Sequence, residues 1–337
     1  MVILPRSSHL HVVLYGRLGN NIVQCINSIA ACHIYKINTI IYDFCGWGST
    51  NDNLSVFLKD LIILPSGLSI HPCDSKLPPK DHLSMINDPG LYSDISKALQ
   101  DPGVCTLIQE DVIHLLRNLF DSPQSCDSDD LDFSKNRPLA IIHLRGDDVF
   151  GKGVVSLERI PNNYVQPPLS FYLNSVEHIL AKRDCRFVVI SQDSLNPVLI
   201  PLAYHLETRQ IGDIFTALPL SRTLQLIRSA DYLISSRGTF IPSLLFSSSK
   251  HPDVFFFRDV ELRHLSIISQ QMHSSYIIHD QLSKYIQQGE WMNLSFQHKM
   301  MLKYPCSALS SPHLATQTLL SNNCKDYASD TSHYAYS

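Results

Sequence analysis

The sequence predicts an α/β protein with two Rossmann-like, doubly wound halves. Three observations predict it. Strands alternate with helices along the chain, turn-forming residues follow several of the strands, and 337 residues are too many for one ordinary core. The composition agrees, because 44% apolar and 17% charged residues are typical of a globular chain rather than a disordered one.

A first strand–helix–strand unit lies near the N-terminus. A short apolar run over residues 11–15 predicts a strand, GRLGNN at 16–21 predicts a turn, and near-helical apolar spacing over 22–35 predicts a helix. The run NTIIYD at 38–43 predicts the second strand. A strand, a glycine turn, a helix and a strand in this order predict parallel pairing of the two strands.

The middle of the chain separates the two halves. Residues 44–103 show poor periodicity, and a helical pattern returns over residues 105–120. Residues 121–136 are polar and acidic, and we interpret them as a linker. A solvated acidic loop is the favoured interpretation of their carboxylates, and a metal site is the less favoured alternative. We therefore expect an N-terminal domain over residues 1–136.

The second half repeats the alternation of strands and helices. Strands are predicted at 139–144, 186–191, 231–235 and 253–257, and helices at 169–181, 223–228 and 240–248. We expect this domain to span residues 137–304 and to face the first across a cleft, which is the layout of a GT-B glycosyltransferase. Residues 305–337 are rich in Ser, Asn and Thr and predict a flexible tail.

Net charge and hydropathy limit the classes of partner and the compartments that the chain suits. A net charge of −4 argues against nucleic acid, which requires a basic patch, but leaves room for a small anionic ligand. No apolar run approaches the roughly 20 residues of a membrane span, and residues 1–8 lack the features of a signal peptide. We expect a cytoplasmic protein, or a Golgi protein if an N-terminal anchor is missing from this chain. Nine cysteines without a CxxC pair predict mostly reduced, buried thiols.

Three loops at predicted strand ends hold the candidate site, because open α/β sheets bind ligands there. In the first loop, Arg17, Gly19 and Asn20 precede a helix whose N-terminal N–H groups favour an anion. We expect Gly19 either to adopt a positive φ or to lie against the ligand. A tight strand-to-helix turn explains the same glycines without a ligand. The spacing differs from the GxGxxG dinucleotide pattern, which argues against a nicotinamide enzyme.

The second loop is HLRGDD, at residues 143–148. Arg145 would leave the strand end toward the cleft, and its planar guanidinium suits a diphosphate. Asp148 would orient Arg145 or fasten the loop. An exposed ion pair after a strand is the alternative interpretation. Asp193, after the next predicted strand, is interpreted as a loop cap rather than a catalytic group.

The third loop is SSRGTF, at residues 235–240. The hydroxyl of Ser236, the backbone of Gly238 and the side chains of Thr239 and Phe240 would form a second anion-binding cradle at a helix start. Simple N-capping of that helix by Thr239 explains the same residues without a ligand.

Together these segments resemble the fucosyltransferase superfamily. GRLGNN with Gln24 is similar to the GxxGNQ segment of α-1,2-fucosyltransferases, and HLRGDD to the HxRxGD motif shared with α-1,6- and protein O-fucosyltransferases. FVVISQDS is similar to a family strand that ends in Ser-Asp-Asp, and SSRGTF to a late Ser/Thr-Phe segment. Order and approximate spacing agree over roughly residues 12–248.

The resemblance implies a GT-B fold and an inverting transfer of fucose from GDP-fucose to a glycan hydroxyl, with no metal and no other cofactor. It implies that Arg145 binds the β-phosphate and that His143 contacts the nucleotide or shapes its pocket. The other donor contacts that it implies are Arg17, Asn20, Thr239 and Phe240.

Several positions depart from the family pattern. Asn21 stands where the family has Gln, Gly146 where it often has a second Arg, and Asp147 where it has Gly. The acidic residue that reads guanine in the family falls at Thr223. A GT-B enzyme with a different nucleotide sugar, and a non-catalytic glycan- or nucleotide-binding relative, therefore remain alternatives. Asp43 and Asp147 are the candidates for the catalytic base.

Overall fold

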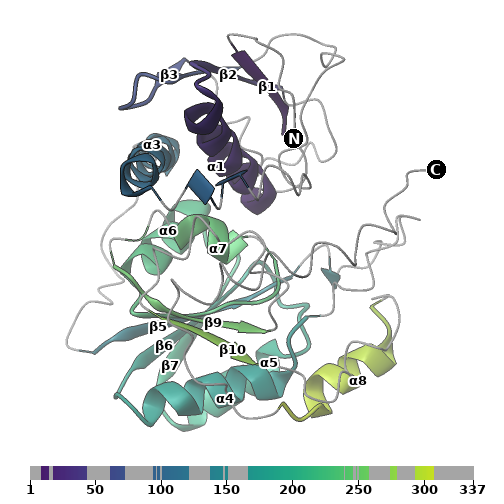
Figure 1. The fold of residues 1–337 in the computed structure, drawn as a ribbon. Coiled ribbons are helices and arrows are strands. Elements are labelled where there is room, and N and C mark those ends of the chain that lie inside the picture. The colour runs from purple at the N-terminus through teal and green to yellow at the C-terminus, as the bar shows by residue number, and fades with distance from the viewer. Residues whose placement is uncertain are drawn as a thin grey trace.

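The described part of the chain forms two β-sheets with helical layers between and below them (Figure 1). The computed structural model describes residues 9–14, 18–43, 61–72, 94–95, 97–98, 101–120, 137–146, 149–150, 166–238, 240–245, 248, 250–257, 274–278 and 293–306.

The N-terminal sheet has four strands in the order β1-β2-β4-β3. Three of them pair in parallel, whereas β3 runs antiparallel to β4. Helix α1 joins β1 to β2 and packs against both strands, so the predicted strand–helix–strand unit is confirmed. The elements are β1 (His9–Val13), α1 (Leu18–Tyr35), β2 (Thr39–Asp43), β3 (Ile62–Ile63), β4 (Ser69–Pro72) and α3 (Pro102–Phe120).

The start of α1 differs from the prediction. The helix begins at Leu18, so Gly19 and Asn20 lie in its first turn rather than in a loop. Gly19 has no positive φ, so the first of its two expected roles is wrong, and the second, a position against the ligand, stays a prediction.

The C-terminal sheet has six strands, all parallel, in the order β10-β9-β8-β5-β6-β7. In chain order this is the 3-2-1-4-5-6 arrangement of a Rossmann fold, with its topological switch point between β5 and β8. The strands are β5 (Leu139–Leu144), β6 (Arg186–Ser191), β7 (Gly212–Thr216), β8 (Tyr232–Ile234), β9 (Asp253–Phe257) and β10 (Ser274–Ile278).

Helices cover both faces of this sheet, which confirms the predicted α/β class and the doubly wound arrangement of this half (Figure 1). Continuous apolar strands such as LAIIHL make this possible, because each face buries alternate side chains of the same run. One face packs against α4 (Leu169–Leu180), α5 (Leu199–Thr208) and α8 (Ser295–Lys303), and the other against α6 (Leu220–Ser229) and α7 (Phe240–Leu244).

The two sheets share one hydrophobic core. Helix α1 packs against α7, and a continuous cluster of buried side chains runs from β1 through α1 and α7 to β5. Ile22 of α1 and Ile241 of α7 belong to this cluster, and both are 1% exposed. Because the predicted linker at 121–136 lies outside the described residues, the domain boundary at 136/137 and the tail after 304 stay predictions.

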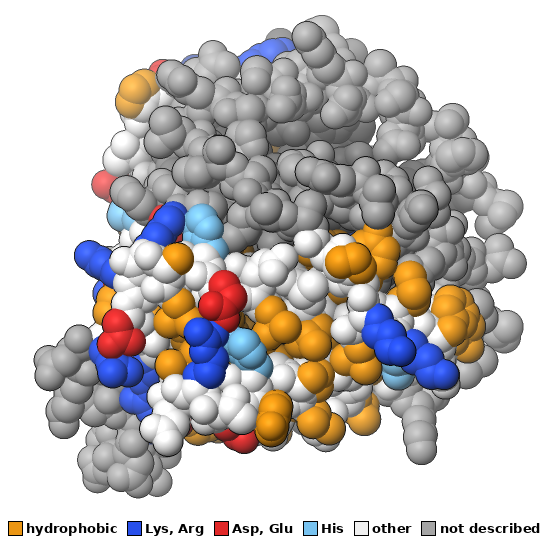
Figure 2. Space-filling model, turned by 90° about the horizontal axis from the view of Figure 1, so that it is seen from below, with side chains coloured by type: hydrophobic (Ala, Val, Ile, Leu, Met, Phe, Trp, Pro, Cys, Tyr) orange, Lys and Arg blue, Asp and Glu red, His pale blue; other side chains and the backbone are white. Residues whose placement is uncertain are grey.

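The opposite, lower face of the molecule is formed by α4, α5 and α8. Figure 2 shows apolar side chains on this face with charged side chains between them. The most exposed of the large apolar residues are Ile200 (76%) and Tyr204 (70%) of α5. None of the helices in the described part of the chain combines the length and apolar character that crossing a membrane requires.

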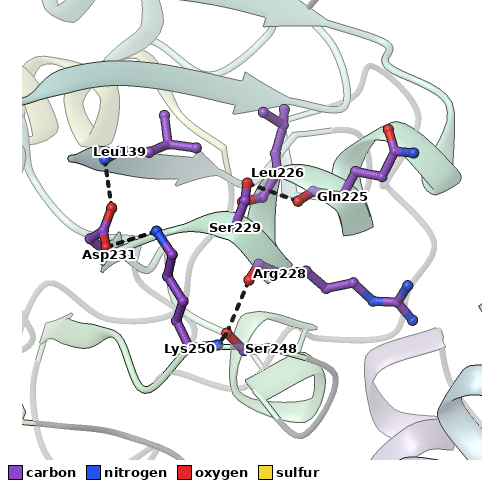
Figure 3. Close-up of polar contacts among 8 residues, drawn as sticks. All are labelled: Leu139, Gln225, Leu226, Arg228, Ser229, Asp231, Ser248 and Lys250. Atoms are coloured by element: carbon purple, nitrogen blue, oxygen red, sulfur yellow. Dashed lines mark hydrogen bonds and ion pairs between the residues drawn. The ribbon is translucent and has the colours of Figure 1, made fainter. Parts of the chain in front are cut away.

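The amino ends of β5 and β8 are fastened by side-chain contacts (Figure 3). Asp231 Oδ2 accepts the Leu139 N–H at 2.9 Å, and Lys250 Nζ lies 2.9 Å from Asp231 Oδ1. Ser248 Oγ donates to the Arg228 carbonyl at 3.4 Å, which ties the segment before β9 to the end of α6. These contacts lie at the amino ends of the strands, whereas the candidate site lies at their carboxyl ends.

Candidate active site at the switch point

The carboxyl ends of β5 and β8 bring two of the predicted loops together. The strand register pairs Ile142 with Ile234, so His143 and the residues after β8 emerge side by side. The Ser236 N–H donates to the His143 carbonyl at 3.0 Å and extends the pairing beyond the last strand residue of β8. In an open α/β sheet, this crevice at the switch point is where ligands bind.

His143 forms the first polar contact across the switch point. Its Nδ1 lies 2.7 Å from Ser236 Oγ, and its ring lies 5.3 Å from the Phe240 ring, at a tilt of 36°. The side chain keeps some surface, yet protein atoms surround the ring on most sides. Burial, and to a smaller extent the positive charge of Arg145, lowers the pKa of His143 from 6.5 to about 3. His143 is therefore neutral at pH 7, and Nε2 is the ring atom that remains for a ligand.

Arg145 forms the second connection across the switch point. Gly238 has a φ of +136°, and a Cβ built on it would lie 2.6 Å from Arg145 Nη1. The guanidinium therefore extends from the end of β5 to the loop after β8 and packs against the bare backbone of Gly238. Glycine meets two requirements here, since any other residue would be strained at this φ and would collide with Arg145.

The main chain of Arg145 is fastened by a residue from the neighbouring loop. Asn196, which follows β6 and is 2% exposed, donates from Nδ2 to the Arg145 carbonyl at 2.8 Å. Asn196 Oδ1 accepts the Val198 N–H at 3.0 Å, so both ends of the amide are engaged. Asn196 was not predicted from the sequence. The dipeptide Asn196-Pro197 was the available signal, because Asn-Pro marks turns.

Gly146 lies against the side chain of Asp193. A Cβ at residue 146 would meet the carboxylate atoms of Asp193 at 2.6 to 2.7 Å. Asp193 Oδ1 accepts the Leu195 N–H at 2.8 Å, which confirms its interpretation as a loop cap. A glycine at residue 146 thus has a steric reason, because a larger residue would displace the capping carboxylate.

A second arginine follows β8 in the chain. Arg237 follows β8 directly after Ser236 and is only 7% exposed. Arg237 belongs to the SSRGTF segment, and no role was predicted for it from the sequence. Arg145 beside a neutral imidazole makes this edge suitable for an anion, because arginine suits phosphate geometry and cannot lose its charge at physiological pH.

The structure brings five of the predicted residues together. His143, Arg145, Ser236, Gly238 and Phe240 meet at the switch point. The remaining predicted residues of the described chain are Gly19 and Asn20 in the first turn of α1, and Asp43 at the end of β2. Arg17, Asp147, Asp148 and Thr239 lie outside the described residues, so their predicted roles stay predictions.

The first predicted loop leads into α1, which contacts the second half of the chain. Asn20 is half-buried, and its carbonyl accepts a hydrogen bond from Gln24 Nε2 at 3.2 Å within α1. Helix α1 packs on α7, which begins at Phe240, so the first and third predicted loops lead into helices that touch. The role of Asn20 toward a donor stays a prediction.

Comparisons with known proteins find weak similarity to several solved structures, but they do not assign the chain to a family. No protein-family model matches the chain, and no curated protein matches its sequence. Among solved structures, Escherichia coli ADP-heptose lipopolysaccharide heptosyltransferase II is similar at a TM-score of 0.36 and 8% identity, over 80% of this chain and 90% of that one. A putative UDP-N-acetylglucosamine 2-epimerase from Listeria monocytogenes is similar at a TM-score of 0.35 and 13% identity, over 77% and 60%.

The UDP-GlcNAc 2-epimerase of Neisseria meningitidis, solved with UDP-GlcNAc, is similar at a TM-score of 0.33 and 14% identity, over 75% of this chain and 68% of that one. Likenesses of this size carry no argument about activity. The proposals below depend on the chain's own geometry and on its motifs.

Proposed function

We propose that the chain is an inverting glycosyltransferase of GT-B type that transfers fucose from GDP-fucose to a glycan hydroxyl. The observation that carries the proposal is the position of Arg145. Its guanidinium lies at the switch point of a Rossmann-ordered sheet, against a glycine with a φ of +136°. That position supports a diphosphate site, because ligands bind at the switch point and a guanidinium fits two phosphate oxygens.

The chemistry requires stabilisation of a leaving group. The bond between the sugar C1 and the β-phosphate oxygen breaks, and a bond forms between C1 and the acceptor oxygen. Negative charge grows on the departing diphosphate, and a fixed guanidinium stabilises that charge more in the transition state than in the ground state. Arg145 would thus do the work that a divalent metal does in other transferases. The acceptor proton goes to a base, for which Asp43 and Asp147 remain the candidates.

His143 supports this assignment through its neutral state. With a pKa of about 3, its ring is uncharged at pH 7 and serves as a hydrogen-bonding group whose orientation Ser236 restrains. A neutral ring does not compete with Arg145 as a counter-ion. We therefore assign the phosphate charge to Arg145 and assign His143 to the positioning of the nucleotide.

A specific observation favours a different nucleotide sugar as the second candidate. The position that corresponds to the family's guanine-reading acid is Thr223, which carries no carboxylate. Its hydroxyl donates to the Pro219 carbonyl at 3.3 Å, in the first turn of α6. The diphosphate contact through Arg145 would be common to both candidates, whereas recognition of the base would differ.

Thermal shift with a panel of nucleotide sugars tests the proposal, because a ligand that binds the folded state raises its melting temperature. GDP-fucose, other GDP-sugars, UDP-sugars and ADP-sugars are compared at equal concentration, with and without excess chelator. The largest shift for GDP-fucose, unchanged by chelator, is expected. A larger shift for a UDP- or ADP-sugar would favour the second candidate, and no shift for any donor would contradict both.

A further inference from the structure

The loop that carries Arg145 is tied to the neighbouring loop through the main chain of Arg145 itself. We propose that Asn196 is a positioning residue, which sets the direction in which Arg145 leaves β5 and so holds the guanidinium in place for a diphosphate. This inference rests on the proposed function, since it names the residue through which the phosphate contact is maintained.

The hydrogen bonds of Asn196 leave its amide little freedom. Nδ2 donates to the Arg145 carbonyl at 2.8 Å, while Oδ1 accepts the Val198 N–H at 3.0 Å. The side chain is 2% exposed, so water is a poor replacement for either partner. Because Val198 is the N-cap residue of α5, the amide connects the start of that helix to the first residue after β5.

The path of the Arg145 loop is also restricted on a second side. Asp193 lies against Gly146, where no side chain fits. Asn196 and Asp193 both belong to the loop between β6 and α5, so this one loop contacts two consecutive residues of the Arg145 loop. With the main chain held in this way, the Arg145 side chain extends to Gly238. A tilt of the Arg145 main chain would swing the guanidinium, which lies several bonds away, by a larger distance.

A plain capping role is the competing explanation for Asn196. In that case only the contact of Oδ1 with the Val198 N–H matters, as in an ordinary turn before a helix. Two substitutions separate the roles. Asn196→Asp keeps an acceptor for Val198 but replaces the donor to Arg145 with an oxygen. Asn196→Ser keeps a shorter acceptor without adding a charge, and it lacks the reach to the Arg145 carbonyl.

A matched control exists at the opposite end of the same strand. Asp231 Oδ2 accepts the Leu139 N–H at 2.9 Å, at the amino end of β5 (Figure 3). Asp231→Ala removes a side-chain tie to β5, as the Asn196 variants do, but on the edge away from Arg145. This variant reports what a general loosening of the sheet does to ligand binding.

The test compares the affinities of GDP and GMP by calorimetry, at a temperature well below the melting temperature of every variant. Their ratio isolates the β-phosphate, so a purely structural defect leaves it unchanged. We expect both Asn196 variants to lower the native ratio by about tenfold, since small misplacements of a binding group have effects of this size or larger. GMP affinity should change little, and Asp231→Ala should keep the native ratio.

A native ratio in both Asn196 variants would overturn the inference, as would an equal loss of the ratio in Asp231→Ala. If the native protein binds GDP and GMP equally, the proposed function fails, and a nucleotide-free readout then decides about Asn196. The rate at which phenylglyoxal modifies Arg145, followed by peptide mass spectrometry, should rise in both Asn196 variants and not in Asp231→Ala. An unchanged rate in the Asn196 variants would overturn the positioning role independently of the donor.

Discussion

Arg145 Nη1 lies 2.6 Å from the point where a Cβ on Gly238 would be, so the two residues use the same small volume at the switch point. One residue follows β5 and the other follows β8, which are adjacent strands with crossovers in opposite directions. The guanidinium can take this position only because residue 238 has no side chain. The proposed phosphate contact therefore depends on Gly238 as well as on Arg145.

Gly238→Ala is expected to lower both stability and donor affinity. The φ of +136° strains any residue with a Cβ, by roughly 1 kcal/mol or more, and the new methyl group displaces Arg145. Gly67→Ala is the matched control, because Gly67 has a φ of +89° but no atom within 4 Å of a built Cβ. Melting curves should show a loss in both variants, whereas GDP affinity should fall only in Gly238→Ala. Equal GDP affinity in the two variants would argue against the contact.

Gly146→Ala is expected to disturb Asp193. The added Cβ would lie 2.6 Å from Asp193 Oδ1, so the carboxylate must move and its bond to the Leu195 N–H is weakened. We expect a loss of about 1 kcal/mol in unfolding free energy, the value of one weakened hydrogen bond, because the half-buried carboxylate can turn away. In a double-mutant cycle, Asp193→Ala should remove most of that loss. Additive effects of the two substitutions would show that Gly146 is required for another reason.

Acid should destabilise the protein partly through His143. Its pKa is about 3 in the folded chain and 6.5 in the unfolded chain, so below pH 6.5 the unfolded chain takes up a proton that the folded chain does not. The resulting loss of stability is absent above pH 6.5 and grows by up to about 1.4 kcal/mol per pH unit down to about pH 3.

Denaturant unfolding at pH 7 and pH 5 measures this effect. Native protein should lose more stability between the two values than His143→Asn, because the variant lacks the titrating ring. His178 and His298, whose pKa values are also lowered by burial, contribute equally to both proteins. Identical losses in native protein and variant would mean that His143 titrates normally in the folded chain.

Asn20→Ala tests the predicted contribution of α1 to the donor site. Asn20 is half-buried in the first turn of the helix, and its main chain is retained in the variant. We expect the transfer rate to fall about tenfold or more, because a hydrogen bond to a charged group contributes at least that factor. The melting temperature should change little. Asn38→Ala, at an exposed position beyond the other end of α1, should leave transfer unchanged. Full transfer in Asn20→Ala would place the N-terminal part of the site elsewhere.

The predictions from sequence succeeded where strands are buried on both faces. LAIIHL, RFVVIS and DVFFF became β5, β6 and β9 with the predicted bounds, because uninterrupted apolar runs suit a parallel sheet covered by helices. The edge strands β7 and β10 were not predicted, and β9 therefore does not close the sheet. GDIFT is only half-buried and lacks such a run, and the short β3 and β4 leave even less signal.

Helices, like strands, were predicted where their sequence pattern is strong and missed where they are short or largely exposed. Helices α1, α3, α4 and α6 were found with shifted ends, whereas α5, whose outer face exposes Ile200 and Tyr204, and the short α8 were missed. The predicted helix at 240–248 is shorter in the structure, where α7 ends at Leu244.

Within the site, local motifs were more informative than distant partners. HLRG and SSRG could be placed at strand ends, because HLRG contains the last two residues of β5 and SSRG directly follows β8. The tie between Asn196 and Arg145 joins residues 51 positions apart and depends on the register of β5 with β6, so no periodicity reports it. The close contact between Gly238 and Arg145 arises because β5 and β8 are neighbours in the sheet. The alternation of strands and helices along the chain does not determine which strands are neighbours.

Calorimetric titration of GDP and GMP into native protein and Arg145→Ala tests the central claim most directly. Arg183→Ala, an exposed arginine after α4, serves as the matched control. The account predicts that native protein and the control bind GDP about ten- to a hundredfold more tightly than GMP, as a charge-assisted contact implies, and that Arg145→Ala largely abolishes the preference. Equal binding of GDP and GMP to the native protein, or a preference that survives in Arg145→Ala, would contradict the account.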